Sequence, residues 1–206
     1  MIVCEDQNTE PYYFDKFKKL FPNDTVYVKN VGTGKKPLGI VKTAIALKEQ
    51  IAVETKRVID EVWMVFDKDD EGNNRKTLKN FNEAWSLALE NEISIAFSNE
   101  VFELWLLLHL KDVNADTALG RNQIYEALEK EIKKRRSYKD FIYIHGKNEI
   151  IDVLQQIGNE NKAITRAKQL FEYQLAKKPL DANPCTYVHL LVMKLRELIA
   201  WYSYGL

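Results

Sequence analysis

Apolar runs and amphipathic segments alternate through the first half of the chain. Four apolar or alternating runs, at residues 1–4, 25–31, 61–66 and 93–97, predict strands. Residues 10–21, 37–55, 74–92 and 100–110 carry apolar side chains every three to four positions, which predicts helices. The run at 61–66 is nearly all apolar, as expected of a strand buried on both faces. This alternation predicts an α/β fold with a mostly parallel four-stranded sheet flanked by helices.

The second half of the chain has a different pattern. After about residue 111 the strand signals stop, and amphipathic helix patterns follow at residues 121–136, 148–158, 161–178 and 186–202. Only "FIYIH", at 141–145, has the alternation of a strand. We therefore expect residues 1–110 to form the catalytic core and residues 111–206 a helical extension packed on it.

Details of the pattern predict which side chains face inward. In the helix at 74–92, Leu78, Phe81, Trp85 and Leu89 recur at helical spacing and are expected in the core. Ser98 and Asn99 precede the apolar string "FELWLLLHL" and are expected to cap its helix.

Composition narrows the class of protein. The chain has 206 residues, of which 46% are hydrophobic and 29% charged, so it can bury a sizeable core. No apolar run reaches the roughly 18 residues of a membrane span, and no signal peptide is evident at the first residues. Cys4 and Cys185 are expected to be buried, reduced thiols. A cytoplasmic protein without membrane contact is the expectation.

Charge is balanced overall but distributed unevenly. Residues 1–110 hold 14 Lys and Arg against 18 Asp and Glu, which leaves 16 against 12 for the rest of the chain. An acidic half and a basic half fit a metal site beside a phosphate-binding surface, although ordinary surface charge explains the same difference. Residues 130–147 have seven Lys and Arg against two acids, interleaved with aromatic residues. This composition suits nucleic-acid backbone contacts with base stacking, or equally a solvated helix face.

Acidic residues follow two of the predicted strands. Asp67 and Asp69 come directly after the buried strand at 61–66, and Glu5 follows the strand at 1–4. Ligands of open α/β sheets gather at the carboxyl ends of strands, where these side chains can turn toward one point. Hard oxygen ligands of this kind select Mg²⁺ or Mn²⁺. A solvated turn explains Asp67 and Asp69 alone, but Glu5 at a second strand end favours the metal site.

The sequence does not match three other motifs that contain similar residues. An EF-hand loop that begins at Asp67 would need its bidentate glutamate at Leu78. The "GTGKK" at 32–36 lacks the first glycine and the Ser or Thr of a P-loop. In a haloacid-dehalogenase phosphatase, the Asp-x-Asp motif would follow the first strand, whereas here it follows the third.

Together these residues resemble a known family. A glutamate after the first strand and Asp-x-Asp after the third is similar to the Toprim domain of topoisomerases, primases and overcoming-lysogenization-defect nucleases. More narrowly, "IVCEDQNTEPYYF", "VWMVFDKDDEG", "SNEVFELWLLLHL" and "NPCTYVHLLVMKL" resemble the RloB-like family. Three positions depart from its pattern: Asp6 stands where a glycine is usual, Gln7 where an acid is, and Glu100 where a proline is.

The resemblance implies a Toprim fold and magnesium-dependent phosphodiester chemistry in bacterial anti-phage or abortive-infection loci. Glu5 would be a metal ligand or general acid/base, and Asp67 and Asp69 would hold Mg²⁺ (or Mn²⁺). Such proteins are often encoded beside an ATPase partner. Asp6, which stands in place of the glycine, could itself add a ligand.

Further residues are candidates for the same chemistry. Glu103 begins a helix near the end of the fourth strand, where it would serve the metal site or simply stabilise the helix start. Lys147 could stabilise charge in the site. His109 is expected to be a satisfied, partly buried histidine. The predicted nucleic-acid contacts are Lys133, Lys134, Arg135, Arg136, Tyr138 and Lys139.

The sequence thus predicts a metal-dependent Toprim endonuclease, with RNA or tRNA favoured over DNA by analogy. A non-catalytic module that binds nucleic acid or a partner ATPase is the main alternative, which the altered "CEDQ" favours and the retained acids oppose. A magnesium phosphohydrolase acting on nucleotides is a third. The oligomeric state stays open, a homo-oligomer included.

Overall fold

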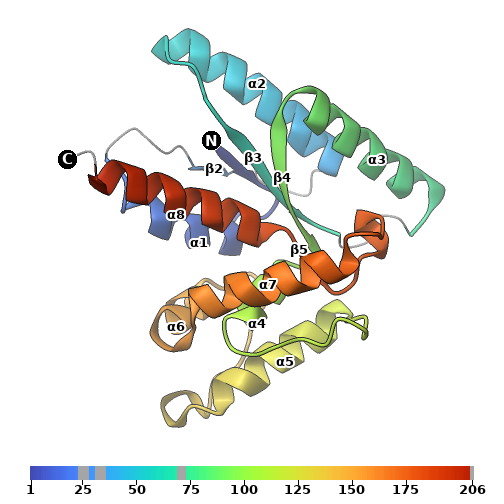
Figure 1. Ribbon diagram of the computed structural model, residues 1–206, viewed down its shortest axis with the longest axis vertical. Coiled ribbons are helices and arrows are strands. Elements are labelled where there is room, and N and C mark those ends of the chain that lie inside the picture. Colours follow the sequence, from blue (N-terminus) through green and yellow to red (C-terminus); the bar gives the residue numbers. More distant parts are fainter. Residues whose placement is uncertain (23–27, 31–35, 69–72, 205–206) are drawn as a thin grey trace. The chain divides into compact units, whose positions relative to one another are not determined.

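The computed structural model describes residues 1–22, 28–30, 36–68 and 73–204, and Figure 1 shows its elements. In chain order they are β1 (Ile2–Cys4), α1 (Thr9–Lys18), β2 (Val28–Asn30), α2 (Pro37–Thr55), β3 (Val62–Asp67), α3 (Arg75–Glu90), β4 (Ile93–Asn99), α4 (Glu103–Leu108), α5 (Arg121–Lys133), the 3₁₀ turn η1 (Arg136–Tyr138), α6 (Glu149–Ile157), α7 (Glu160–Gln174), the 3₁₀ turn η2 (Pro179–Asp181), β5 (Cys185–Thr186) and α8 (Val188–Tyr204).

The strands form one sheet with the order β2-β1-β3-β4-β5. Strand β1 pairs in parallel with β2 and with β3, in a register that sets Cys4 opposite Val65. The α/β class and the mostly parallel arrangement of the first four strands are therefore confirmed. The expectation that strands stop after residue 111 is wrong, because β5 pairs antiparallel with the end of β4 through Ser98↔Thr186 and Asn99↔Cys185. A strand of two residues, such as β5, is too short to produce a recognisable alternation of apolar and polar residues.

Contacts divide the chain into two compact units. The first unit comprises Met1–Phe66, Asp70–Ala96 and Lys194–Leu206, and the second comprises Asp67–Asp69 and Phe97–Met193. These units do not coincide with the predicted ranges 1–110 and 111–206, since α4 groups with the later helices and the end of α8 groups with the first unit.

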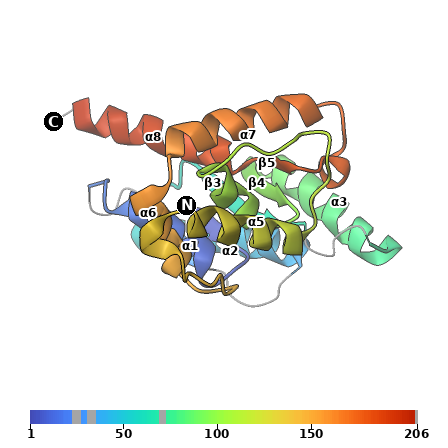
Figure 2. The same ribbon diagram turned by 90° about the horizontal axis from the view of Figure 1, so that it is seen from below.

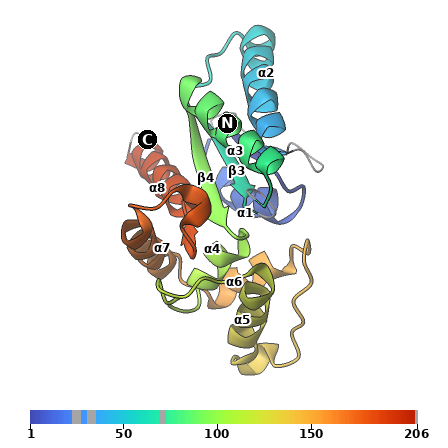
Figure 3. The same cartoon turned by 90° about the vertical axis from the view of Figure 1, so that its right-hand side faces the viewer.

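The first unit packs helices against its buried strands. Helices α2 and α3 lie side by side, as Figures 1 and 3 show. The inward face of α3 consists of Phe81, Ala84 and Ala88, which are all buried. Leu78 and Leu89, which the periodicity placed inside, are 41% and 63% exposed. The small alanine side chains permit close helix packing, so the large residues at the edges of the stripe stay outside.

The core of the second unit is built on the apolar helix α4. All six of its residues are buried, and α4 packs against α5 and α7. Strand β5 lies against α7, a contact that can be followed in Figure 2. Within the sheet, the Ser98 and Thr186 hydroxyls are hydrogen-bonded at 3.0 Å. Ser98 is therefore part of a buried strand and not a helix cap.

Two expectations from composition can be compared with the structure. Cys4 and Cys185 are buried free thiols, as predicted, and burial raises the pKa of the Cys185 thiol to about 12. Within the described ranges, none of the helices combines the length and the apolar character that crossing a bilayer requires.

Candidate functional site

Glu5 follows β1 directly, at the carboxyl end of a parallel strand in the first unit. Its backbone N–H donates to the carbonyl oxygen of Val65 in β3 at 2.9 Å, which extends the parallel ladder one step beyond Cys4. Its side chain is partly buried. Glu5 thus lies at the carboxyl end of a parallel strand, where ligands of such sheets bind.

Asp6, where the resemblance noted in the sequence predicts a glycine, has a structural role. Its Oδ1 accepts the N–H of Gln7 and its Oδ2 accepts the N–H of Thr9, both at 2.7 Å. The buried Glu10 accepts the N–H of Asp6 at 3.3 Å. Short polar side chains that accept first-turn N–H groups stabilise helix starts. Both carboxylate oxygens of Asp6 are therefore engaged at the beginning of α1.

Asp67 is the last residue of β3, and its carboxylate is oriented by the start of α4. Its Oδ2 accepts the backbone N–H of Phe102 at 2.9 Å. Next along the chain, the Lys68 N–H donates to the Ser98 carbonyl at 2.9 Å and so continues the ladder to β4. Asp69, the third predicted metal ligand, lies outside the described residues.

Glu100, where the resemblance noted in the sequence predicts a proline, pairs with Lys68. The Lys68 Nζ lies 2.5 Å from Glu100 Oε1, and both side chains are largely buried. The peptide bond between Asn99 and Glu100 is cis. Asn99 does not cap α4, because its side-chain amide donates to the carbonyls of Pro179 and Leu180. Glu100 therefore supplies a negative charge that neutralises Lys68, the residue next to Asp67.

Glu103, the first residue of α4, is buried, with only 2% of its surface exposed. The Tyr143 hydroxyl donates a hydrogen bond to its Oε1, and His145 Nδ1 lies 3.5 Å from the same oxygen. Burial raises the pKa of Tyr143 well above its usual range, and the charges of Glu103 and Asp67 add to the effect. The phenol therefore stays protonated and remains a donor to the carboxylate. Glu103 thus orients Tyr143, in addition to its place in the first turn of α4.

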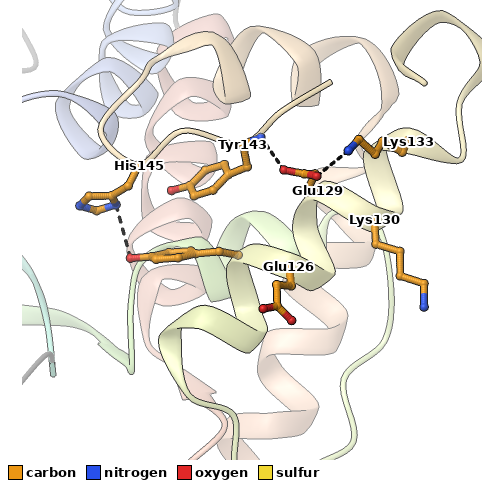
Figure 4. Close-up of a pocket in the computed structure, with 7 residues that line it drawn as sticks. Glu126, Glu129, Lys130, Lys133, Tyr143 and His145 are labelled. Carbon is orange, nitrogen blue, oxygen red and sulfur yellow. Dashed lines mark hydrogen bonds and ion pairs between the residues drawn. The ribbon is translucent and has the colours of Figure 1, made fainter. Parts of the chain in front are cut away.

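A pocket of about 500 Å³ lies beside this pair, between α5 and the segment that carries Tyr143 and His145 (Figure 4). The ring planes of Tyr143 and His145 are tilted by 32° and 33° from that of Tyr125, and their ring centres lie 5.0 and 5.6 Å from its ring centre. Glu129 fixes the wall, since its Oε2 accepts the Tyr143 N–H at 2.9 Å and its Oε1 lies 2.6 Å from Lys133 Nζ. The residues that line the pocket are Tyr125, Glu126, Glu129, Lys130, Lys133, Tyr143 and His145.

The hydrogen bonds of Glu129 to Lys133 and to the Tyr143 N–H lower its pKa. It therefore stays a carboxylate at neutral pH. The segment 141–145 is irregular and not a strand, because Tyr143 hydrogen-bonds to side chains of other elements instead of a neighbouring strand.

The predicted nucleic-acid residues fall into two groups. Lys133 and Lys134, at the end of α5, are neutralised by Glu129 and Glu131 on the same helix. Arg135, Arg136 and Lys139 are exposed around η1. The Tyr138 hydroxyl donates to Gln156 Oε1 at 2.7 Å, which fixes its ring at the surface. Lys147 is exposed, and its backbone N–H closes a turn on Ile144.

Some predicted residues come together and others do not. Asp67 and Glu103 belong to the second unit and are linked through Phe102 and Tyr143, whereas Glu5 belongs to the first unit. Among the described residues, which leave out Asp69, no cluster of three or more His, Cys, Asp or Glu side chains could hold a metal.

The sequence analysis missed Tyr125, Glu126, Glu129 and His145. Tyr125, Glu126 and Glu129 lie on the amphipathic helix α5, where such residues are typical of a solvated face. The neighbouring residues Tyr125 and Glu126, on the partly exposed side of α5, were the sequence feature that could have indicated a binding site.

Comparison with known proteins assigns the chain to a family. A sequence model of a family described as RloB-like protein matches residues 1–195. No curated protein and no solved structure matches the chain.

Proposed function

The chain belongs to the RloB-like family, and we propose that it is a magnesium-dependent endonuclease that hydrolyses nucleic-acid phosphodiesters in anti-phage defence. The observation that carries the proposal is the parallel register of β1 and β3. It sets Glu5 at the end of one strand beside the strand whose last residue is Asp67. RNA, tRNA included, is favoured over DNA only by the analogy with Toprim nucleases.

The chemistry of the donor set fits a hard divalent cation. Glu5, Asp67 and Asp69 would hold Mg²⁺ or Mn²⁺, because carboxylate oxygens are the ligands these ions prefer. When bound, the ion supplies polarisation of a phosphate oxygen and a lowered pKa for an attacking water. Asp67 is oriented for this role by the Phe102 N–H, which holds one of its two oxygens at 2.9 Å.

The protein's own residues bind and orient the substrate. Arg135, Arg136 and Lys139 are exposed cations that suit contacts to backbone phosphates. Lys147 is also exposed, so its flexible side chain could reach a phosphate in the bound complex and stabilise developing charge. Glu5 at the strand end serves as a ligand or as a general acid/base. Glu103 acts through Tyr143, which it holds by a hydrogen bond, rather than by direct contact with the substrate.

A non-catalytic module of a defence complex is the second candidate. The observation that favours it is Asp6, whose two oxygens are both engaged by N–H groups at the position where the family pattern has a glycine. Such a module would bind nucleic acid or an ATPase partner of the same locus without cleaving anything. Both the cytoplasmic location and the ATPase partner remain predictions.

A cleavage panel tests the proposal. Wild type and Asp67→Ala are incubated with labelled tRNA, other RNA, DNA and nucleotides, with Mg²⁺, Mn²⁺ or EDTA. The matched control is Asp181→Ala, which removes an exposed aspartate of the same unit at the end of η2.

We expect cleavage by wild type and by Asp181→Ala, and none by Asp67→Ala or in EDTA. If wild type is inert on every substrate, with and without the candidate ATPase, the nuclease proposal fails. Cleavage of nucleotides alone would identify a phosphohydrolase.

A further inference from the structure

The pocket beside α5 has the dimensions of a ligand site. Its volume is about 500 Å³, inside the range of roughly 300–1,000 Å³ that small-molecule sites occupy. All of its lining residues belong to the second unit, and none of them is a predicted metal ligand. The pocket therefore has a composition that the metal-dependent chemistry leaves unexplained.

Aromatic rings supply a stacking surface in this pocket. The ring plane of Tyr125 makes angles of 32° and 33° with those of Tyr143 and His145. Such rings stack on the flat face of any nucleobase, since every base has a π-face. The side chains of Tyr125 and Tyr143 are partly buried, whereas His145 is exposed. The two tyrosine side chains are thus partly covered by the protein, and His145 is open to solvent.

Two carboxylates hold this stacking surface in place before any ligand arrives. Glu103, nearly fully buried, accepts the hydrogen bond of the Tyr143 hydroxyl. Glu129 accepts the backbone N–H of the same residue at 2.9 Å. The Tyr143 hydroxyl is therefore fixed to α4 and its backbone to α5. A preorganised surface lowers the entropy cost of binding.

The charged rim gives the pocket a chemical preference. Glu126 and Lys130 lie one turn apart on α5 and are both exposed (Figure 4). A carboxylate only accepts hydrogen bonds, so Glu126 favours a base edge that presents adjacent donors. Guanine offers an imino and an amino N–H side by side, whereas uracil offers one N–H between two carbonyl oxygens. The Lys130 ammonium suits the adjoining phosphate.

We propose that this pocket binds one unpaired nucleobase, stacked on Tyr125 and Tyr143, and that Glu126 makes it prefer guanine to uracil. The inference rests on the proposed function in one respect, namely that the ligand is part of the nucleic-acid substrate. It assigns Tyr125, Glu126 and Lys130 to substrate recognition.

Fluorescence anisotropy with short labelled oligomers tests this assignment. The probes are uridine pentamers whose central residue is guanosine, inosine or uridine, in ribose and deoxyribose forms. Full-length protein is titrated in EDTA, so that binding is measured without cleavage. We expect the guanosine pentamer to bind at least about fivefold more tightly than the all-uridine pentamer, with inosine between them. A preference in either sugar series supports the pocket and identifies the sugar that it accepts.

Variants separate stacking from base reading. Tyr125→Ala should weaken binding of the guanosine pentamer at least about fivefold, whereas Tyr125→Phe retains the ring and the affinity. Glu126→Gln should remove most of the guanosine advantage and leave the all-uridine affinity within about twofold. Tyr173→Ala, at an exposed tyrosine of α7, is the matched control and should bind as wild type does. Circular dichroism confirms that each variant is folded.

Three results would overturn the inference: equal affinity for all central bases, unchanged binding by Tyr125→Ala, or no binding by wild type. Asp67→Asn separates these failures from failure of the proposed function, because it should lose cleavage while keeping the base preference. If wild type shows the base preference but never cleaves, the pocket assignment is supported and the nuclease proposal is refuted. If wild type cleaves and substitution of Tyr125 or Glu126 changes nothing, the nuclease proposal is supported and the pocket assignment is refuted.

Discussion

Tyr143→Phe removes one oxygen atom and thereby the hydroxyl that donates to the buried carboxylate of Glu103. Hydrogen bonds to charged groups contribute about 1.5–3 kcal/mol, and Glu103 is only 2% exposed, so water cannot easily replace the lost donor. We therefore expect a loss of about 2 kcal/mol in the free energy of unfolding. For a chain of this length, that corresponds to a fall in Tm of about 4–8 °C.

Urea and thermal unfolding followed by circular dichroism measure this loss. Tyr173→Phe is the matched control, because Tyr173 also donates its hydroxyl to a carboxylate, that of Asp116, but at an exposed position. Solvent replaces the hydroxyl there, so Tm should hardly change. Glu103→Met combined with Tyr143→Phe removes both partners and should be less destabilised than the sum of the single variants. Strict additivity, or equal losses in Tyr143→Phe and Tyr173→Phe, would refute the reasoning.

Three further predictions follow from the packing and charges. Gly158→Ala places a Cβ 2.6 Å from the Leu154 carbonyl oxygen and should cost about 1–3 kcal/mol, whereas Gly120→Ala meets nothing closer than 3.7 Å and should be nearly neutral in thermal melts. Burial lowers the pKa of His189 to about 4, so its stabilisation is present above pH 6.5 and falls by about 3 kcal/mol as pH drops to 4. His189→Gln should flatten that part of the pH–stability curve, and an unchanged slope would exclude this histidine as its cause. Arg135→Ala and Arg136→Ala should each lower the slope of log affinity against log salt by about 1, without changing base preference.

Hydrophobic periodicity predicts where the helices lie better than which residues they bury. The pattern at residues 37–55 predicts α2 with the bounds that the structure has, Pro37–Thr55. On α3 the spacing is right, but Ala84 and Ala88 are buried in place of Leu78 and Leu89. The hydrophobicity of a side chain does not reveal how closely a neighbouring helix approaches.

Short and irregular segments are beyond this kind of prediction. Strand β5 has two residues, and its pairing with Ser98 and Asn99 depends on a contact across almost ninety residues of chain. The segment at 141–145 alternates like a strand, but Tyr143 is held by side chains of α4 and α5 instead. Tertiary hydrogen bonds override local preference in both cases.

The positions of Glu5 and Asp67 at strand ends could be predicted from the sequence because both follow apolar runs, whereas their role as metal ligands stays a prediction. Strand ends of a parallel sheet share an edge, so Glu5 and Asp67 follow from chain order alone. The pocket could not be found in this way, since Tyr125 and His145 are 20 residues apart and meet only through the packing of α5. Glu103 was recognised as a candidate, and Tyr143 was recognised as one of the aromatic residues in the basic stretch 130–147, but the contacts of Glu103 with Tyr143 and His145 were not predicted.

The rate of phosphodiester hydrolysis by Asp67→Asn tests the central claim most directly. The variant keeps an oxygen to accept the Phe102 N–H but loses the negative charge proposed to hold Mg²⁺. On the substrate that wild type cleaves, with saturating Mg²⁺, a metal role worth several kcal/mol predicts a loss of at least about 100-fold in single-turnover rate at unchanged Tm. A folded Asp67→Asn protein that cleaves within about threefold of the wild-type rate would contradict the account.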